Sequence, residues 1–382
     1  MKIAVFRESR PGETRVALTP EAVKALTNDG WQVVVQRGAG LRAHFSDDAY
    51  QAAGATIEDG PTGDVNVRVN PPTLDEVKLL PEGSLHLSFL SPLLSLDVVK
   101  ALVARKITVL SFDLLPRISR AQYMDALSSQ ATVSGYRAAL AGATYFDRFF
   151  PLLTTAAGTI RPAKVLVMGV GVAGLQAIAT AKRLGAKVRA YDVRSAAKEE
   201  AESAGAVFVK LGVTADAAGG YARELTDEER AQQQAALLSE VAGADVVITT
   251  AAVPGRKAPI LLTTAMVEAM GEGSLVIDMA ADGGGNCELT KPGEVVEHGG
   301  VRVVGLSNPP AEMGSHASFM YANNVLKLLA LFGSKGVLSP DWNDEVVIGV
   351  TVARDGKVNH APSAVALGVE HVAIVPDVKE NA

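Results

Sequence analysis

The stretch KVLVMGVGVAGLQAIATA, residues 164–181, constrains the fold more than any other part of this chain. Its first half has the β-branched, apolar composition of a buried strand, and its second half has the pattern of a buried helix. Between them, Gly169, Gly171 and Gly174 form the pattern G-x-G-x-x-G. Glycine at these points permits a tight turn, close approach of backbone N–H groups to a pyrophosphate, and close packing of helix on strand. The stretch therefore predicts a strand–turn–helix unit that binds a dinucleotide, in preference to a turn without a ligand.

The residues around this turn indicate which dinucleotide is bound. The next predicted strand, KVRAYD, ends at Asp192, close to the roughly twenty residues that separate turn and acidic residue in such folds. Its carboxylate can accept hydrogen bonds from ribose hydroxyls and repels a 2′-phosphate, so NAD(H) is favoured over NADP(H). Arg194 is consistent with the opposite preference, because an arginine at this place can also bind a phosphate. The expected cofactor-binding set includes three neighbouring residues, Val172, Ala173 and Val193.

The composition excludes several classes of protein. Hydrophobic residues make up 48% and charged residues 20% of the 382 residues, which is typical of folded domains. The formal net charge is −6 and no dense basic run occurs, so nucleic acid is not expected as a partner. The six histidines do not cluster at metal-ligand spacing, and no metal site is expected. A single cysteine, Cys287, rules out an internal disulfide and is expected to be buried and inert.

The sequence does not predict direct insertion into a membrane. The longest apolar run, residues 165–181, is interrupted by glycines and by Gln176, and a strand with a buried helix explains it better than a span. The first residues, MKIAVFRESRPGETRVALTP, predict a strand and a charged loop and not a signal peptide. A cytoplasmic protein that can dock on a membrane-bound partner is the expectation.

Two series of alternating strands and helices predict two domains. The apolar runs of the first 111 residues alternate with helical patterns, and a second series begins at Val165. Repeated βα units of this kind imply parallel sheets covered on both faces. The expected fold is α/β, with two Rossmann-like parallel-sheet domains joined by long helices and a cofactor cleft between them. Residues 1–135 with a returning segment 325–382 are expected to form the N-terminal domain, and residues 136–324 the NAD(H)-binding domain.

Further loops are expected at the nucleotide site. The stretch TTAAVPGR, with Thr250 and Ala251, and the stretch DMAADGGGN, with Asp282 and Asn286, each follow a predicted strand at its carboxyl end. Open α/β sheets bind ligands at that edge. An ordinary glycine-rich turn is the alternative for both. The stretch DAAGGYAREL, in which glycines precede Tyr221, fits a hinged flap and a flexible linker equally well.

The stretch PRISRAQYMDALSSQ, residues 116–130, concentrates polar side chains just before a predicted alanine-rich helix. Arg117, Gln122 and Asp125 lie within nine residues. They fit a solvated loop with a surface ion pair, which contributes under about 1 kcal/mol, and they equally fit polar groups placed over a reaction. The residues alone leave both alternatives open.

Longer motifs resemble those of a known family. RESRPGETRVALTPEAVKALTNDGWQVVVQRGAG and GVGVAGLQAIATAKRLGA are similar to the alanine dehydrogenase and pyridine nucleotide transhydrogenase superfamily. Within it, PRISRAQYMDALSSQ, GGYARELT and DMAADGGGNCELTKPGEVVE resemble the branch of NAD(H)-binding alpha-1 subunits (domain I) of proton-translocating transhydrogenases. The resemblance covers residues 1–330.

This resemblance implies a reaction and a set of site residues. The reaction is a direct, Re/Si-specific hydride transfer between NADH and an NADP+ held by a partner subunit. Arg117, Gln122 and Asp125 match an Arg-Gln-Asp loop over the nicotinamide, where Gln122 contacts the incoming nucleotide and the other two fix the orientation of the ring. Ser128 matches a serine near the carboxamide, and Tyr136 matches a tyrosine beside the site.

The resemblance also implies partners. The chain is expected to form a homodimer and to act with a membrane-spanning alpha-2 subunit and an NADP(H)-binding beta subunit. It is then peripheral on the inner face of the cell membrane, and proton translocation belongs to the partner subunits.

An amino-acid dehydrogenase is the main alternative within the same superfamily. Arg15 matches the arginine that binds the substrate carboxylate there, but Asn70 and Ser91 stand where its catalytic lysine and histidine are expected. Neither side chain shuttles a proton near neutral pH, Arg68 does not deprotonate, and His86 lies off the expected point. Arg15 is then expected to be a structural ion-pair residue. A third possibility is a non-catalytic module that binds NAD(H).

Overall fold

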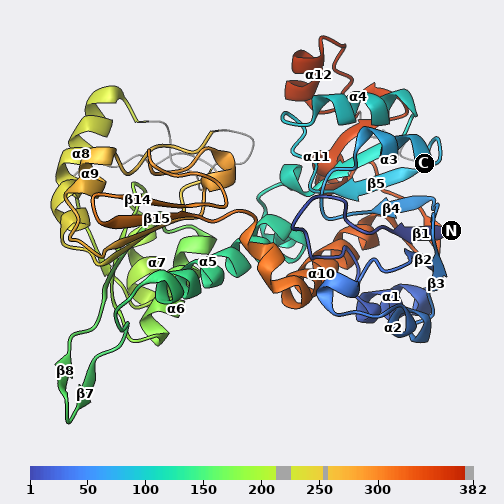
Figure 1. The fold of residues 1–382 in the computed structure, drawn as a ribbon. Helices are drawn as coiled ribbons and strands as arrows, with labels where there is room; N and C mark the ends of the chain where they lie inside the picture. Colours follow the sequence, from blue (N-terminus) through green and yellow to red (C-terminus); the bar gives the residue numbers. More distant parts are fainter. Residues whose placement is uncertain (212–224, 253–256, 375–382) are drawn as a thin grey trace. The chain divides into compact units, whose positions relative to one another are not determined.

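The structure is a computed structural model that describes residues 1–211, 225–252 and 257–374. The chain divides into two compact units, Met1–Gln130 with Ala311–Ala382, and Ala131–Pro310. The boundaries predicted from the sequence, after residues 135 and 324, fall inside two long helices, α5 (Ala126–Tyr145) and α10 (Gly314–Phe332). A helical pattern does not change where a helix passes from one unit to another. Each unit contains its own sheet (Figure 1) and is described by itself.

An eight-stranded sheet forms the centre of the first unit, in the order β19-β18-β6-β5-β4-β1-β2-β3. Its strands are β1 (Lys2–Val5), β2 (Gln32–Gln36), β3 (Thr56–Glu58), β4 (Val65–Val67), β5 (Leu85–Ser88), β6 (Thr108–Ser111), β18 (Thr351–Arg354) and β19 (Lys357–Val358). The first six are parallel, as the alternating βα pattern predicts. β18 pairs antiparallel with β6, and β19 antiparallel with β18. The sequence did not indicate β3, because three residues are too few to show a period.

Helices cover both faces of this sheet. Besides α10 they are α1 (Pro20–Asn28), α2 (Asp47–Ala52), α3 (Leu74–Leu79), α4 (Leu96–Ala104), α11 (Glu345–Val350) and α12 (Ala361–Leu367). On one face α1, α2, α10 and α11 enclose an apolar core that contains Tyr50 and Tyr321, and on the other face α3 and α4 pack over Val109. Local sequence sets their starts, since the Thr19 side chain caps α1 and Thr73 belongs to a capping box on α3.

The second unit has a seven-stranded sheet in the order β11-β10-β9-β12-β13-β15-β14. Its strands are β9 (Lys164–Met168), β10 (Lys187–Tyr191), β11 (Val207–Phe208), β12 (Val246–Thr249), β13 (Leu275–Asp278), β14 (Val295–His298) and β15 (Val301–Gly305). All pairs are parallel except β14 with β15. Without the edge strand β14, this is the Rossmann order 3-2-1-4-5-6, and the order reverses between β9 and β12. The predicted Rossmann-like, parallel-sheet fold is confirmed.

The faces of this second sheet are also both covered. In addition to α5, the helices are α6 (Val172–Arg183), α7 (Ala197–Ser203), α8 (Asp227–Ala242) and α9 (Thr264–Glu268). Along β9, Val165 and Val167 pack into the core shared with α5, α6 and α7, while Leu166 and Met168 face the core under α8 and α9. This alternation explains why the strand is apolar at successive positions. No helix of the described residues has the length and the apolar character needed to cross a membrane.

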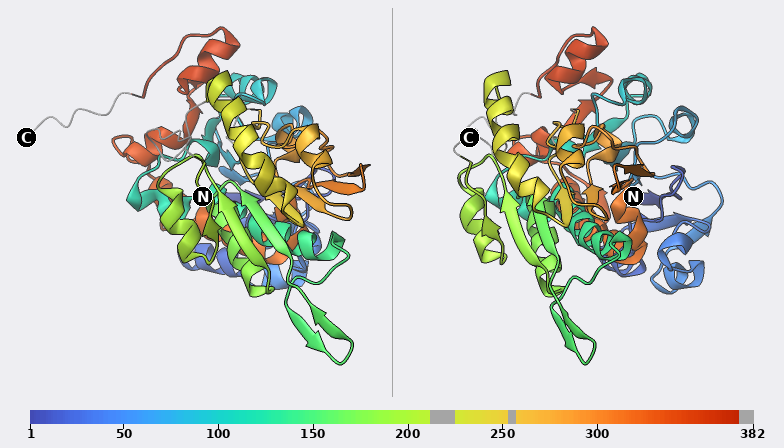
Figure 2. Two further views of the ribbon diagram at one scale, coloured as in Figure 1. Left: turned by 90° about the vertical axis from the view of Figure 1, so that its left-hand side faces the viewer. Right: turned by 60° about the vertical axis from the view of Figure 1, so that its left-hand side comes forward.

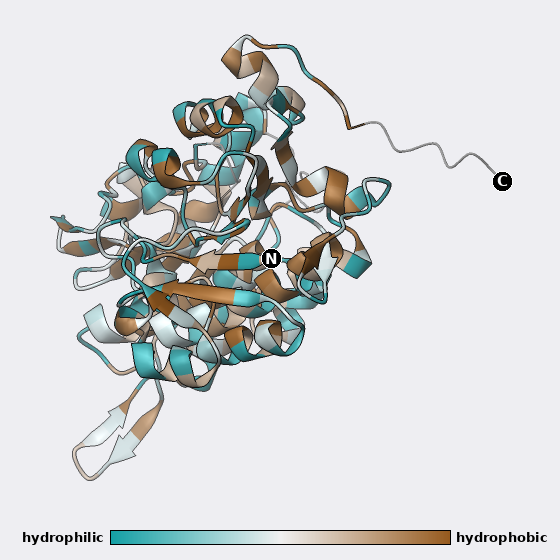
Figure 3. Ribbon diagram, turned by 90° about the vertical axis from the view of Figure 1, so that its right-hand side faces the viewer, coloured by the Kyte–Doolittle hydropathy of each residue, from teal (hydrophilic) through white to brown (hydrophobic). Residues whose placement is uncertain are grey.

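A two-stranded hairpin, β7 (Leu153–Thr155) and β8 (Gly158–Ile160), belongs to neither sheet. It extends away from the rest of the second unit in every view (Figures 1, 2 and 3). Phe149 and Leu152 beside it are 54% and 60% exposed. An isolated two-stranded hairpin is at best marginally stable in water, so its sequence suits packing against another surface.

Candidate functional site

The glycine-rich turn lies between β9 and α6, at the point where the strand order of the second unit reverses. Gly169 has a φ of 96°, in the left-handed region that favours glycine. A Cβ on Gly174 would lie 2.0 Å from the backbone oxygen of Gly169, which no side chain tolerates. These two glycines are therefore required by the turn itself and by the packing of α6 on β9.

Gly171 differs, because the chain itself gives no reason for glycine there. Its backbone is extended, with φ −77° and ψ −171°, and no atom lies within 4 Å of a built Cβ. As the N-cap residue of α6 it has no side chain that could cap the helix, so the first-turn N–H groups face open space. A pyrophosphate fits both features, since it needs close approach to the backbone and several N–H donors.

The fit of Gly171 leads to a prediction about nucleotide binding. Gly171→Ala is expected to raise the dissociation constant of NADH about 10- to 100-fold, because the methyl group displaces a charged phosphate from one backbone donor. The melting temperature is expected to stay within about 1 °C, because the added Cβ meets nothing. Fluorescence titration of NADH and thermal unfolding measure the two quantities.

Gly271→Ala is the matched control for this prediction. Gly271 lies in the same unit, and its Cβ would meet only Ser274 Oγ at an ordinary 3.7 Å. NADH affinity should be unchanged in this variant. Unchanged affinity in Gly171→Ala as well would exclude a phosphate at this turn.

Asp192 lies beside the glycine turn, at the end of β10. Its Oδ2 accepts the N–H of Val170, inside the turn, at 2.7 Å. Arg194 donates to Asp192 through its backbone N–H and Nε, both at 2.9 Å, and its Nη2 forms an ion pair at 2.8 Å. The carboxylate is thus held next to the turn, and the guanidinium that could suit a 2′-phosphate is paired with it.

The loops after β12 and β13 are joined to the turn by hydrogen bonds. Thr250 donates through Oγ1 to the backbone oxygen of Gly169 at 2.9 Å. The buried Asn286 side chain accepts from the N–H of Ala251 at 3.1 Å and donates to its oxygen at 2.7 Å and to that of Pro259 at 2.8 Å. Asn286 therefore holds the loop that carries Thr250 and Ala251.

Asp278, at the end of β13, was not predicted from the sequence. Its Oδ2 accepts the N–H groups of Asn286 and Cys287 at 2.7 and 3.0 Å and the hydroxyl of Thr290 at 2.6 Å. Its place at a strand end, where polar residues gather in such folds, was the available signal. Asp282 is exposed and accepts from Ser307 Oγ at 2.7 Å.

The remaining expected cofactor residues are less informative. Val172 is 40% exposed at the start of α6, and Val193 packs against the core under α8. Tyr136 lies on α5, directly after Gly135, whose Cβ would meet the backbone oxygen of Ala173 at 2.0 Å. Tyr136 is therefore on a helix that packs closely on the start of α6. Tyr221 lies outside the described residues.

The Arg-Gln-Asp stretch belongs to the first unit and forms a short 3-10 helix, η3 (Ser119–Met124). Ala121 and Met124 are buried, whereas Arg117 and Gln122 are exposed. Asp125 follows and caps α5, because its carboxylate accepts the Ser128 N–H at 2.9 Å and its hydroxyl at 2.5 Å. The structure thus joins Asp125 to Ser128 and presents Gln122 outward.

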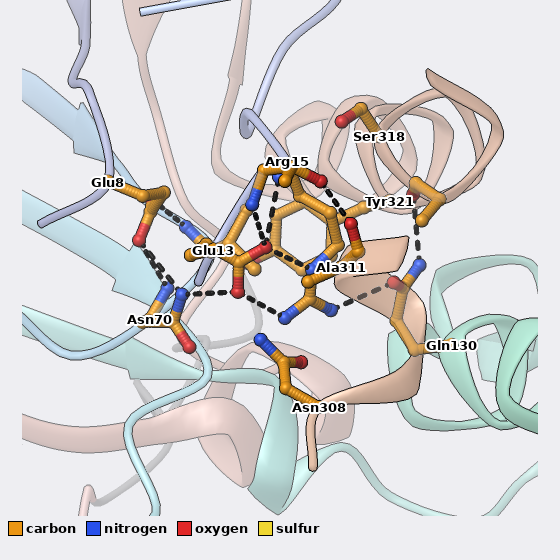
Figure 4. Close-up of polar contacts among 12 residues, drawn as sticks. Glu8, Glu13, Arg15, Asn70, Gln130, Asn308, Ala311, Ser318 and Tyr321 are labelled. Atoms are coloured by element: carbon orange, nitrogen blue, oxygen red, sulfur yellow. Dashed lines mark hydrogen bonds and ion pairs between the residues drawn. The ribbon is translucent and has the colours of Figure 1, made fainter. Parts of the chain in front are cut away.

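Arg15 is the centre of a buried polar cluster in the first unit (Figure 4). It donates through Nε and Nη2 to the two oxygens of Glu13 at 2.8 and 2.7 Å, and through Nη1 to Gln130 Oε1 at 2.9 Å. Burial acts to raise the pKa of Glu13, but the hydrogen bonds and charge of Arg15 outweigh it and lower this pKa to about 2. The expected role of Arg15 as a structural ion-pair residue agrees with this geometry.

Asn70 completes this cluster from the other side (Figure 4). Its Nδ2 donates to Glu8 Oε2 at 3.0 Å and to Glu13 Oε2 at 2.9 Å. Glu8 also accepts the Val69 N–H at 2.7 Å, while burial raises its pKa. The sequence did not predict Glu8, Glu13 or Gln130 here, because the pattern of separate segments does not show which side chains meet in a core.

The other groups considered for proton transfer are not placed for it. Ser91 is fixed through its backbone N–H to Asp113 at 2.8 Å. His86 is fully buried on β5, and burial lowers its pKa to about 3. Its register partners Asn66 and Val109 define a face of the sheet, and Leu87, the next residue, lies in the core with α10 on the opposite face. His86 therefore points away from that core.

Fold and site together define a nucleotide-binding protein with two Rossmann-like units. The family model described as "Alanine dehydrogenase/PNT, N-terminal domain" matches residues 4–134, and "Alanine dehydrogenase/PNT, C-terminal domain" matches residues 138–361. The chain belongs to this alanine dehydrogenase/PNT family, as the motif resemblance predicted.

Individual relatives distinguish the branches of the family. The first of the separate chains of NAD(P) transhydrogenase subunit alpha from Rhodospirillum rubrum is 48% identical over 376 residues, covering 94% of this chain and 98% of that protein. A crystal structure of transhydrogenase from Sinorhizobium meliloti matches with a TM-score of 0.86 and 40% identity, over 94% of this chain and 100% of that one. "Alanine dehydrogenase" of Staphylococcus haemolyticus is 28% identical over 395 residues, covering 100% of both. The similarity favours the transhydrogenase subunits, as expected.

Proposed function

We propose that this chain is the NAD(H)-binding subunit of a Re/Si-specific, proton-translocating transhydrogenase, which transfers hydride directly between NADH and an NADP+ held by a partner subunit. The observation that carries the proposal is the closed cluster around Arg15. Its guanidinium is bonded to Glu13 and Gln130, with Asn70 across the same carboxylate. A substrate carboxylate would have to displace a buried ion pair, and the Asn70 amide beside it does not shuttle protons.

Hydride transfer between two nicotinamides needs no general base at the reacting carbons. NADH, when bound, supplies the hydride. The protein's contribution is then to bind, orient and exclude water, with the two rings brought to roughly 3–3.5 Å. This division of roles agrees with an open glycine turn and with an arginine whose charge is already paired inside the chain.

The nucleotide-binding part of the proposal uses residues of the second unit. The first-turn N–H groups of α6 bind the pyrophosphate where Gly171 leaves space. Asp192 binds the ribose hydroxyls and disfavours a 2′-phosphate, so that NAD(H) and not NADP(H) is selected. Thr250, Ala251 and Asn286 shape the adjoining edge, and Tyr221 and Asp282 remain proposed contacts from the motif resemblance.

The transfer part of the proposal uses the exposed loop of the first unit. Gln122 contacts the incoming nicotinamide nucleotide of the partner, and Arg117 and Asp125 orient the nicotinamide of NADH. Ser128, bonded to Asp125, and Tyr136 lie at the carboxamide end of the site. What supports these roles is the match of spacing to the family loop and the exposure of Gln122 on η3.

The proposed assembly contains two copies of this chain with alpha-2 and beta subunits. The β7–β8 hairpin supports the homodimer, because its base exposes Phe149, Leu152 and Ile160 and it needs a surface to pack on. Through the alpha-2 and beta subunits the chain is held at the inner face of the cell membrane, and proton translocation takes place in those subunits.

Reduction of NADP+ by NADH, with and without a purified NADP(H)-binding partner chain, tests the proposal. Activity is expected only with the partner present, and no reduction of NAD+ is expected when L-alanine is added to this chain alone. Alanine-dependent reduction of NAD+ would identify an amino-acid dehydrogenase. Nucleotide binding without either activity would identify a non-catalytic module.

A further inference from the structure

The Arg-Gln-Asp loop is held in place by the segment that follows α10. We propose that α11, with its N-cap residue Asp344, is a brace for this loop, and that Arg120 and Asp344 are positioning residues for hydride transfer. The inference rests on the proposed function and adds residues to which no role has been given. Arg120 lies two positions before Gln122 on η3, and both positioning residues act through the loop.

The first contact of the brace is a bidentate ion pair. Arg120 Nη1 lies 2.9 Å from Asp344 Oδ2, and Nη2 lies 2.7 Å from Oδ1. The carboxylate of Glu345 adds a contact to Nη2 at 3.3 Å. A two-pronged contact of planar groups fixes direction as well as distance, which a single point charge does not do.

Asp344 is itself held rigidly. Its Oδ1 accepts the backbone N–H groups of Val346 at 2.7 Å and Val347 at 3.4 Å, so the carboxylate caps α11. The hydrogen bond from Arg120 lowers the pKa of Asp344, in keeping with a permanently ionised partner. The same carboxylate thus joins the start of α11 to the middle of η3.

The second contact lies at the beginning of the loop. A Cβ on Gly349 of α11 would lie 2.4 Å from Cγ of Pro116, so only glycine allows this approach. The adjoining Val346 and Val350 are fully buried in the same core as Ala121 of η3. The loop and α11 therefore share one packed core and do not merely touch at the surface.

The third contact lies beyond Gln122. Asn324 of α10 donates through Nδ2 to the backbone oxygen of Tyr123 at 3.0 Å and accepts from Ser129 Oγ at 2.7 Å. The loop is therefore fixed on both sides of Gln122, by Arg120 before it and by Asn324 after it. A six-residue 3-10 helix has little stability of its own, so these contacts determine where Gln122 is presented.

The exposure of the ion pair makes the inference testable. The Arg120 and Asp344 side chains are 44% and 21% exposed, and ion pairs of this kind contribute little to the stability of a fold. Their removal should leave the unit folded while the loop moves. A shift of about 1 Å in a positioning group can slow transfer by up to about 100-fold.

The experiment compares Arg120→Gln, Asp344→Asn and the double variant, since Asn keeps the helix cap but loses the ionic pairing. Hydrogen exchange of the amides of residues 117–125 is measured on the chain alone, and hydride transfer is measured with the NADP(H)-binding partner. Exchange is expected to rise about tenfold and transfer to slow about tenfold in each single variant, with no further change in the double variant. NADH affinity and melting temperature should not change, which a merely structural role would not give.

Arg37→Gln is the matched control, because Arg37 and Asp59 form an exposed ion pair in the same unit. It should alter neither exchange in residues 117–125 nor transfer. Unchanged exchange in the Arg120 and Asp344 variants would overturn the brace, and raised exchange with normal transfer would overturn its positioning role. If the wild-type chain shows no transfer with its partner, the proposed function fails, while the exchange data still decide whether the brace exists.

Discussion

Replacing Gln122 by Asn is expected to slow hydride transfer about 10- to 100-fold while changing the affinity for NADH less than about twofold. Asn carries the same amide on a side chain that is one methylene shorter, so the hydrogen-bonding group is withdrawn by about 1.5 Å from the incoming nucleotide. Misplacement of this size in a positioning group costs up to about 100-fold in rate. Gln122 is exposed on η3, so its replacement should not disturb the core. Stopped-flow transfer rates and NADH titration separate the two effects.

Gln51→Asn is the control for this variant, because Gln51 is an exposed glutamine of α2 in the same unit. Its rate and affinity should equal those of the wild type. Equal losses of rate and NADH affinity in Gln122→Asn would show that Gln122 binds the resident cofactor, and the proposed contact with the partner's nucleotide would be wrong.

Gly174→Ala is expected to destabilise the second unit by about 3 kcal/mol and to abolish measurable NADH binding. The added Cβ would lie 2.0 Å from the oxygen and 2.9 Å from the carbon of the Gly169 carbonyl, and 3.2 Å from Thr250 Oγ1. Backbone cannot move aside as a flexible side chain does, so α6 must shift away from β9. A loss of about 3 kcal/mol corresponds to a fall of about 6–12 °C in melting temperature for a unit of this size. Thermal and urea unfolding measure it.

The contrast with Gly171→Ala makes this result specific. The same methyl group, three positions earlier in the same motif, meets no atom of the chain. Two outcomes are therefore expected from one motif, loss of folding at Gly174 and loss of affinity alone at Gly171. Similar melting temperatures for the two variants would contradict the packing described for this turn.

The sequence predicted most of the fold because the strands are apolar runs with turn residues between them. In the second unit the runs KVLVMG, KVRAYD, AVFVK, DVVITTA, SLVIDMA and VRVVGL all contain strands of the parallel sheet. The edge strand β14 was not predicted, because VVEH is short and half exposed. Edge strands carry weaker patterns, since only one side of the strand and part of one face are covered.

The nucleotide site was partly predictable, because its residues follow strand ends in a motif with fixed spacing. The contacts that organise it were not. Asn286 was expected as a polar group of the pocket, but its side chain bonds within the chain to Ala251 and Pro259. Asp278 appeared as the last residue of a strand, and nothing in the sequence showed that it collects four donors.

The Arg15 cluster shows the same limit. From the sequence, Arg15 was either a substrate anchor or an ion-pair residue. Glu13 is two residues away, and only the folded chain shows that the pair is bidentate and enclosed with Gln130 and Asn70. Side chains from segments far apart in the sequence meet in this cluster, and no local pattern records such meetings.

The central claim is that hydride passes directly from NADH on this chain to NADP+ on a partner, without exchange with water. The most direct measurement uses NADH that carries deuterium at the transferred C4 position, with the partner chain and NADP+ in ordinary water, and determines the isotope in the NADPH formed. The account predicts that the deuterium appears undiluted at C4 of NADPH. Protium from the solvent at that carbon would contradict it.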